Sequence, residues 1–177
     1  MRADVAILGG GLAGLTLAIQ LRQSHPDIGV VVLERGHHPV PVAIHKVGES
    51  SVEIAAHYFS KVLGLGEHLA GAQLKKFGFR FFFSEKQRDL ARVREVGASS
   101  FFPTPTYQID RGIFENFLGE RATERGVRFV TGAAVRSVEL TTDAADHRIA
   151  YEAGGQMCSL EAGWVVDASG RAGVLKR

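Results

Sequence analysis

Three glycines near the N-terminus could hold the phosphates of a cofactor. Gly9, Gly11 and Gly14 form a G-x-G-x-x-G pattern between an apolar, β-branched run at residues 4–8 and a stretch of good helix formers. In such a turn the first glycine permits a tight bend, the second lets a pyrophosphate approach the backbone, and the third lets helix and strand pack closely. The helix start adds unpaired N–H groups and the positive end of its dipole. The residues predicted to cradle the phosphates are Gly9, Gly11, Leu12, Ala13 and Gly14.

An acidic residue follows at the distance that suits a ribose. Glu34 ends a second apolar run and lies twenty positions beyond Gly14. A carboxylate there can accept hydrogen bonds from ribose hydroxyls and disfavours a 2′-phosphate on that ribose. Arg35 adjoins it and is a further candidate for cofactor binding. From these residues FAD and NAD both stay open, ahead of NADP, and a glycine-rich turn without a ligand is the structural alternative.

The elements that must position these residues read as an α/β domain. Residues 4–8 and 28–34 predict strands buried on both faces, joined by a helix that Pro26 ends. Asp110 is the expected N-cap of a helix with a buried face of Ile113, Phe114, Phe117 and Leu118, which Gly126 ends. The later segments are expected to be a strand at 127–132, three short meander segments at 134–140, 148–153 and 157–162, and a buried closing strand at 163–170. The predicted fold is Rossmann-like, with a parallel sheet and a small antiparallel meander.

The middle of the chain gives weaker signals. Ser50 and Glu53 fit a capping box at the start of a helix that Gly64 would end. Residues 76–83 predict a strand, and the aromatic run 81–83 is expected to pack in a core. The charged stretch 84–97 is expected to be solvated.

Composition excludes several classes of protein. The net charge of +2 over 177 residues, without basic blocks among aromatics, does not favour a nucleic-acid surface. The single Cys158 rules out an internal disulfide framework and suits the cytoplasm. The apolar N-terminus could pass for a signal peptide, but three consecutive glycines weaken that interpretation. The histidines at 37, 38 and 45 lack partners at ligand spacing, so no metal site is expected. No other run is long and apolar enough to span a membrane, so no membrane attachment is expected.

Four segments in a fixed order resemble a known family. "GGGLAG…LER", "KVGESS", "YQIDRGIFENFL" and "VVDASGR" are together similar to the N-terminal part of the flavin-dependent halogenases and related FAD monooxygenases. The resemblance touches nearly the whole chain and favours FAD over NAD. It implies that residues 1–177 are the N-terminal portion of an FAD-binding domain, in which residues 64–108 begin an inserted region on the substrate side.

The resemblance also implies roles for single residues. Those expected beside the isoalloxazine ring are Val47, Gly48, Glu49 and Ser50. Those expected near the adenine and ribose are Asp167, Ala168, Ser169 and Gly170, with Val135 pairing its backbone with adenine. Arg111 is implied to reach the FAD. Because a cation in the first turn of a helix opposes the dipole, Arg111 needs compensation. The structural alternatives are a plain helix start for residues 47–50, a strand-ending turn for residues 167–170 and a solvated side chain for Arg111.

Lys76 is the candidate catalytic residue. "KKFGFRF" resembles the family segment whose lysine directs hypohalous acid, formed from reduced FAD, oxygen and halide, onto an electron-rich aromatic ring. A lysine suits this because it is a flexible donor whose pKa can fall on burial. Adjacent lysines are usually solvated, which is the alternative interpretation.

The motifs leave three whole-protein hypotheses. The first is an FAD-dependent monooxygenase or halogenase acting on a small molecule, with a separate flavin reductase. The second is a non-catalytic FAD-binding fragment, or half of a split flavoprotein that needs a complementing C-terminal chain. The third is an NAD-dependent dehydrogenase. The tryptophan-rich W-x-W-x-I-P motif of the halogenases is absent, Trp164 being the one tryptophan, so the chain is expected to lack a C-terminal part needed for catalysis.

Overall fold

The chain divides into two compact units. The computed structural model describes residues 1–42, 46, 48–84, 86–142 and 145–176. The first unit comprises residues 1–45 and 110–177, and the second comprises residues 46–109. The glycine-rich turn therefore belongs to the first unit and Lys76 to the second.

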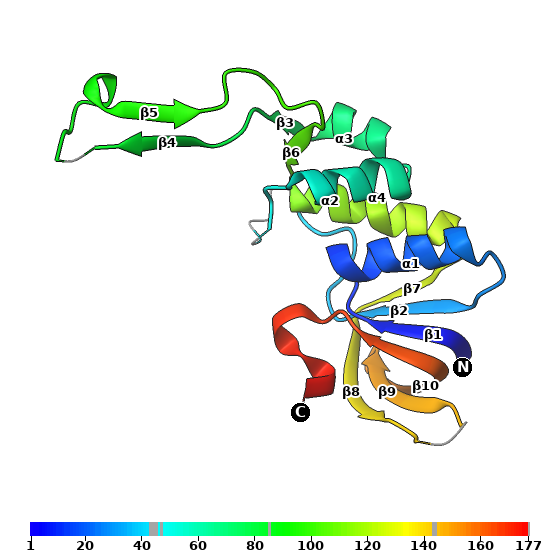
Figure 1. Cartoon of the computed structure of the whole chain (residues 1–177). Helices are drawn as coiled ribbons and strands as arrows, with labels where there is room; N and C mark the ends of the chain where they lie inside the picture. The colour runs from blue at the N-terminus through cyan, green and yellow to red at the C-terminus, as the bar shows by residue number, and fades with distance from the viewer. Residues whose placement is uncertain (43–45, 47, 85, 143–144, 177) are drawn as a thin grey trace. The chain divides into compact units, whose positions relative to one another are not determined.

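The first unit is built on a six-stranded sheet with the order β7-β2-β1-β10-β9-β8 (Figure 1). Its strands are β1 (Arg2–Leu8), β2 (Val30–Glu34), β7 (Arg128–Thr131), β8 (Ala133–Glu139), β9 (His147–Ala153) and β10 (Gln156–Asp167). β7, β2, β1 and the end of β10 pair in parallel, whereas β8, β9 and the start of β10 pair antiparallel. The predicted α/β fold with a parallel sheet and a meander is confirmed.

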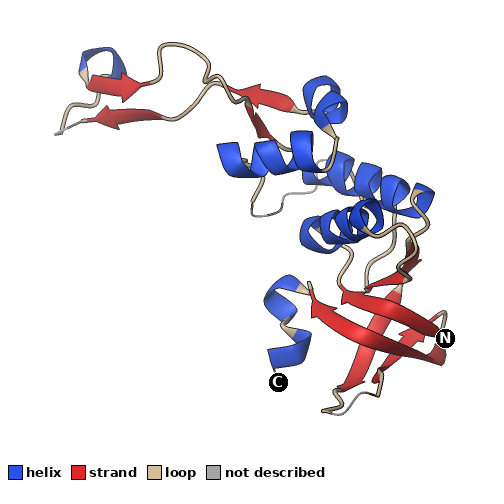
Figure 2. Cartoon of the chain, turned by 45° about the vertical axis from the view of Figure 1, so that its right-hand side comes forward, coloured by secondary structure: helices blue, strands red, loops and turns tan. Residues whose placement is uncertain are grey.

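Two layers cover the parallel strands. Helices α1 (Leu12–Ser24) and α4 (Arg111–Glu124) pack on one face of the sheet (Figures 1 and 2). On the other face Leu8 and Leu33 lie in a buried cluster with Ile149, Tyr151 and Leu160 of the meander. Successive strand residues point to opposite faces. Because both faces are covered, β1 and β2 are apolar at nearly every position, as predicted for strands in a parallel sheet.

The closing strand differs from the prediction. β10 is one strand of 12 residues that runs through the expected break at Gly163. It pairs with β9 up to Ala162 and with β1 from Glu161 to Asp167, so it changes partner instead of turning. Its second half is not a buried strand: Trp164 is 72% exposed, and residues 165–167 are only partly buried.

Helix α4 begins where the sequence predicts, and its buried face includes two of the four predicted residues. The Asp110 carboxylate accepts a hydrogen bond from the N–H of Ile113 at 3.0 Å, which is the expected N-cap. Phe114 and Leu118 are fully buried, but Ile113 and Phe117 are only half-buried. Glu115 takes a buried position that the apolar spacing did not predict.

The second unit contains short elements. They are α2 (Glu53–His57), a π-helical turn (Tyr58–Val62), α3 (Gly66–Ala72), and the strand pairs β3 (Leu74–Lys76) with β6 (Thr106–Gln108) and β4 (Arg80–Phe83) with β5 (Arg94–Gly97). Its core includes Phe59, Leu63, Leu65, Leu69 and Tyr107. No helix in the described part of the chain is long and apolar enough to cross a membrane.

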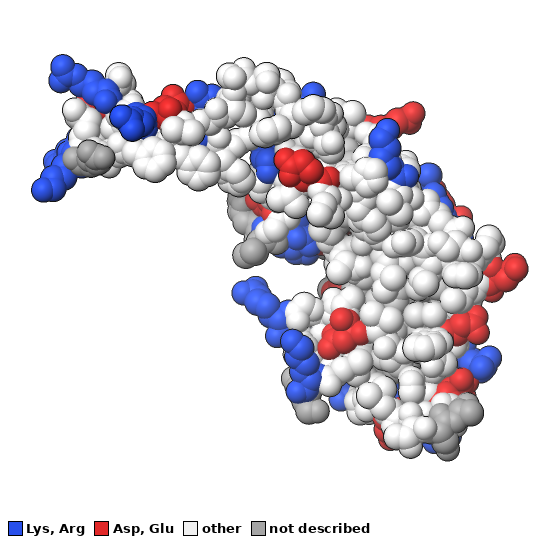
Figure 3. All heavy atoms as spheres, viewed as in Figure 1, with Lys and Arg blue, Asp and Glu red and all other residues white. Residues whose placement is uncertain are grey.

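Two predictions for this unit are wrong, and the strand expected over residues 76–83 is broken, because β3 ends at Lys76 and β4 begins at Arg80. α2 has Val52 as its N-cap residue and no side-chain cap, so Ser50 and Glu53 form no capping box. Ser50 instead bridges to Gln108 beside β6. The run 81–83 does not pack in a core, since each of its phenylalanines is about half exposed, Phe81 at 57%. It lies on a hairpin of two strands, whose free end carries a group of Lys and Arg side chains (Figure 3).

Candidate functional site

The first and third glycines of the turn are required by the protein itself. Gly9 has φ +116°, and a Cβ there would lie 2.4 Å from the carbonyl oxygen of Ala168. A Cβ on Gly14 would lie 1.9 Å from the carbonyl oxygen of Gly9. Ala168 also donates its N–H to the carbonyl of Leu8 at 2.9 Å. These contacts hold the turn tightly between β1, α1 and the end of β10.

The middle glycine is not explained by packing. A Cβ on Gly11 would have Glu115 Oε1, at 3.8 Å, as its nearest neighbour, and its φ of −82° suits any residue. Gly11 caps α1 without a side-chain hydrogen bond, and Leu12 and Ala13 form the first turn. The missing side chain thus leaves room beside backbone N–H groups at a helix start, which is the arrangement that binds a diphosphate. The residues present fit the pyrophosphate of a dinucleotide.

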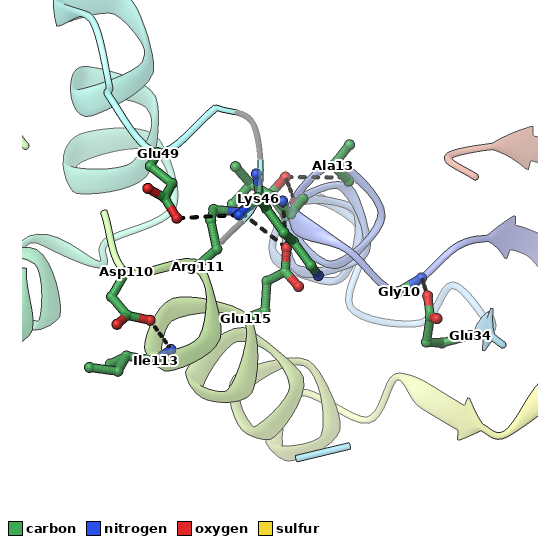
Figure 4. Close-up of polar contacts among 11 residues, drawn as sticks. Gly10, Ala13, Glu34, Lys46, Glu49, Asp110, Arg111, Ile113 and Glu115 are labelled. Atoms are coloured by element: carbon green, nitrogen blue, oxygen red, sulfur yellow. Dashed lines mark hydrogen bonds and ion pairs between the residues drawn. The ribbon is translucent and has the colours of Figure 1, made fainter. Parts of the chain in front are cut away.

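Glu34 is fixed at the carboxyl end of β2. One carboxylate oxygen accepts a hydrogen bond from the N–H of Gly10 at 2.6 Å (Figure 4), and the other accepts from the N–H of Gly36 at 2.6 Å. Each oxygen of a carboxylate has two acceptor sites, so Glu34 keeps capacity for a ribose hydroxyl. Sequence reasoning missed Gly10, whose only signal was its place within three consecutive glycines.

A cavity of about 360 Å³ lies at the carboxyl ends of β1 and β2. It is lined by Gly9, by Glu34 and Arg35, by residues 133–136 including Val135, and by Ser169 with the turn that follows it. The strand order runs to β2 on one side of β1 and to β10 on the other, and ligands of open α/β sheets bind at such a reversal. The structure thus gathers five predicted cofactor residues around one cavity.

Asp167 does not line this cavity itself but fixes by hydrogen bonds the turn after β10, which forms one wall of the cavity. One of its oxygens accepts from the N–H of Ser169 at 3.0 Å and from its hydroxyl at 2.5 Å, and the other accepts from the N–H of Leu175 at 2.9 Å. Burial acts to raise the pKa of Asp167, but the hydrogen bonds from Ser169 and Leu175 outweigh it and hold the pKa below its ordinary value. Gly170, with φ +63°, begins the short helical turns that Asp167 ties down.

Arg111 is compensated by a buried acid. Its Nη2 and Nε donate to Glu115 Oε1 at 2.5 and 3.1 Å (Figure 4). The Glu115 side chain is 1% exposed and that of Arg111 is 12% exposed. Sequence reasoning expected such compensation without naming the partner. The position of Glu115, one helical turn after Arg111 and among apolar residues, was the available signal.

In the second unit the candidate lysine is linked to the predicted flavin segment. The Lys76 ammonium donates to Ser50 Oγ at 2.9 Å and to the carbonyl of Ser51 at 2.5 Å. Gly48 has φ +92°, and the carbonyl of Glu49 accepts from the N–H of Ile109 at 2.6 Å. Val47 lies outside the described residues. Ser51, which also exchanges hydrogen bonds with the backbone of Tyr107, was not predicted.

Lys76 also faces a cavity of about 350 Å³ with aromatic walls. Phe79, Phe81 and Phe102 line it, together with Glu53 and Thr106. The ammonium lies 5.1 Å from the centre of the Phe79 ring. Lys76 is half-buried whereas Lys75 is exposed, so the two adjacent lysines have different surroundings. Among the residues that the structure describes, no cluster of His, Cys, Asp and Glu could hold a metal ion.

Comparisons with known proteins agree with this architecture. The family described as "FAD binding domain" matches residues 2–177. The flavin-dependent halogenase chlA of Dictyostelium discoideum is 27% identical over 143 residues, covering 77% of this chain and 24% of that protein. The flavin-dependent halogenase CmlS superposes with a TM-score of 0.78 at 24% identity, covering all of this chain and 31% of that one. The halogenase PltM, solved with phloroglucinol and FAD, gives a TM-score of 0.71 at 20% identity, covering 94% of this chain and 34% of that one.

The chain therefore spans about a quarter to a third of the length of these relatives. Their names confirm the resemblance to flavin-dependent halogenases that the four segments indicated. The cofactor is FAD, which removes the basis for the NAD-dependent alternative. The chain belongs to the FAD binding domain family.

Proposed function

We propose that the protein is an FAD-dependent oxidoreductase of the halogenase type, which uses reduced flavin and oxygen to halogenate an electron-rich small molecule. The observation that carries this is Lys76: its ammonium is held by Ser50 and Ser51 at the wall of an aromatic-lined cavity. Similarity to chlA supports the same reaction class. Residues 46–109 would then be the region on the substrate side.

The first unit would bind the cofactor. The start of α1, with Gly11 open beside it, would hold the pyrophosphate. Glu34 would accept hydrogen bonds from the ribose, and the cavity beside Val135 and Ser169 would take the adenine. Arg111 would add a cation near the diphosphate. Bound and reduced, FAD supplies the electrons that activate oxygen.

The second unit would direct the halogen. With hypohalous acid as the electrophile, the Lys76 ammonium can donate a hydrogen bond to its oxygen and orient the halogen towards the substrate ring. The ring carbon then bonds to the halogen, the halogen–oxygen bond breaks, and the oxygen leaves as water after taking the ring proton. The aromatic rings that line the cavity would stack on a flat substrate. Gly48, Glu49 and Ser50 would lie beside the flavin ring.

The second candidate is an FAD monooxygenase that hydroxylates its substrate, because the FAD binding domain family does not separate the two reactions. Either reaction needs reduced flavin, so a separate flavin reductase is the expected partner.

The test compares Lys76→Ala with Lys75→Ala as matched control. The protein as its gene encodes it is loaded with FAD and given a flavin reductase, NADH, bromide and phloroglucinol, the molecule bound in PltM. Mass spectrometry then measures brominated and hydroxylated product. We expect bromination by the wild type and Lys75→Ala, and its loss in Lys76→Ala with flavin reoxidation kept. Hydroxylated product without bromine would favour the monooxygenase, and unchanged bromination by Lys76→Ala would remove Lys76 from the reaction.

A further inference from the structure

Glu115 is a buried carboxylate that helix packing does not require. Its side chain is 1% exposed, and acidic residues are almost never that buried without a partner. Arg111 supplies the partner through two hydrogen bonds to the same oxygen, Oε1. The two residues lie one turn apart on α4, so the pair is local to the helix.

This pair differs from the exposed pair on the same helix. Arg121 and Glu124 are 40% and 60% exposed and pair at 2.7 Å. An exposed pair of this kind contributes little and is optional. Taking Arg111 and Glu115 out of water carries a desolvation penalty, and an apolar pair of the same volume would often serve the fold equally well. Arg111 also opposes the dipole of α4. Because the fold alone does not require this ion pair, the pair indicates a functional role for the Arg111 guanidinium.

The position of Glu115 indicates that role. Among the described residues, and apart from the chain neighbours of Gly11, the Oε1 of Glu115 lies nearest, at 3.8 Å, to the place that a Cβ on Gly11 would take. The acid thus lies beside the uncapped start of α1, where the proposed function puts the pyrophosphate. A bare carboxylate there would repel a diphosphate. Ion-paired, it is neutralised, and it holds the guanidinium at the same place.

We propose that Glu115 is a positioning residue for FAD binding: it fixes the Arg111 guanidinium beside the start of α1, where that guanidinium meets the pyrophosphate. This inference rests on the proposed function for the placement of FAD. According to this proposal the Glu115 carboxylate strengthens the binding of the anionic pyrophosphate, whereas simple charge repulsion would weaken it. Whether the removal of Glu115 weakens or tightens FAD binding therefore tests the proposal.

The decisive variant is Glu115→Gln, with the exposed Glu120→Gln on the same helix as matched control. A bystander acid next to the pyrophosphate would weaken binding, so its removal would tighten FAD. A positioning acid predicts the opposite: the Kd for FAD, measured by titration calorimetry, rises about tenfold, the size of one lost charge-assisted hydrogen bond. Glu120→Gln leaves the Kd unchanged. The double variant Arg111→Ala/Glu115→Gln should bind no more weakly than Arg111→Ala alone, because both remove the same interaction.

Further measurements separate this role from a structural one. The unfolding temperature without FAD shows whether Glu115→Gln only loosens the fold, and the slope of log Kd against log salt concentration should fall in Glu115→Gln but not in Glu120→Gln. If Glu115→Gln does not fold, Glu115→Asp keeps the charge but moves the guanidinium, and it should also raise the Kd.

Failure of this inference differs from failure of the proposed function. If Gly11→Ala binds FAD as tightly as the wild type, the pyrophosphate does not lie on α1 and the proposed placement is wrong. If Gly11→Ala weakens binding while Glu115→Gln leaves it unchanged or tightens it, the positioning role alone is overturned. Weaker binding with an unchanged salt slope, or additive losses in the double variant, would also overturn it.

Discussion

The sheet unit and the β4–β5 hairpin of the second unit place their aromatic and aliphatic side chains very differently. In the first unit Phe114 and Leu118 of α4 are fully buried, and both faces of β1 and β2 are covered. In the β4–β5 hairpin of the second unit Phe81 is 57% exposed, and the neighbouring phenylalanines are exposed to a similar degree. A ribbon of two strands has no second layer to bury either face, and such hairpins are marginal by themselves.

This difference shows what each unit is built to hold. In the sheet unit the parallel strands are buried on both faces, and open space remains at the carboxyl ends of β1 and β2 and beside Gly11 at the start of α1. In the second unit the cavity at Lys76 is lined by several of the aromatic rings that are exposed. Substitutions in the buried layers of the first unit should therefore act on folding and those beside these openings on cofactor binding, whereas substitutions in the hairpin should act on ligands with little effect on folding.

Gly14→Ala is expected to have the largest effect. A Cβ at 1.9 Å from the backbone oxygen of Gly9 forces the backbone of the helix or of the turn to shift, which is costly because no flexible side chain can yield instead. We expect a loss of about 4 kcal/mol or more in the free energy of unfolding, in the range of the most damaging substitutions. Urea denaturation followed by circular dichroism measures it. A stable Gly14→Ala protein would contradict the tight packing of α1 on the turn.

Gly11→Ala should separate folding from cofactor binding. Its φ of −82° and open surroundings accept a methyl group, so the free energy of unfolding should change by less than about 1 kcal/mol. The Kd for FAD should rise more than about tenfold, because the methyl group occupies the approach of the pyrophosphate. An unchanged Kd would mean that this glycine serves some other purpose.

Phe114→Ala and Phe81→Ala test the contrast between the units directly. Phe114 is fully buried between α4 and its neighbours, so its truncation should destabilise the protein by about 3–5 kcal/mol. Phe81 is exposed, and its truncation should stay within about 0.5 kcal/mol in the same denaturation experiment. A large loss from Phe81→Ala would show that the hairpin is packed in solution.

The sequence predicted the elements whose signals are local. The glycine spacing placed the β1–α1 turn, and Asp110 marked the start of α4, because a turn and a cap depend on residues close in the chain. The strands β1 and β2 were recognisable as buried because they are covered on both faces. FAD followed from the order of four segments, which a single glycine motif would not have given.

The errors arose where long-range partners decide the outcome. Ser50 fits a capping box locally, but it bridges to Gln108 and accepts from Lys76, both distant in sequence. The break expected at Gly163 is absent because β10 gains β1 as a partner there. The burial of Glu115 depends on Arg111 and on the space beside Gly11. An aromatic run such as 81–83 suggests a core, but it gives no information on whether a second layer exists.

The smallest expected effect is on the pH dependence of stability, for which one carboxylate in each unit can be compared. Asp167 is held by hydrogen bonds from Ser169 and Leu175, and they keep its pKa below the ordinary value of 3.8. A pKa that is lower in the folded state gives stability that is present above the unfolded value and lost as pH falls through the folded value. In the hairpin, the Arg80 guanidinium hydrogen-bonds to Glu95 and lowers the pKa of that carboxyl, but both side chains are solvated.

Asp167→Asn and Glu95→Gln should therefore differ. Asn cannot accept from both Ser169 and Leu175 in the same way, so Asp167→Asn should have a lower unfolding temperature than the wild type at neutral pH, with the gap closing below about pH 4 as the wild-type carboxyl is protonated. Glu95→Gln should match the wild type across the range, because solvated ion pairs contribute little. Thermal unfolding from pH 7 to 2.5 measures both. A gap for Asp167→Asn that persists at the lowest pH would mean that the carboxylate charge does not hold the wall of the cavity, and that side-chain shape alone does.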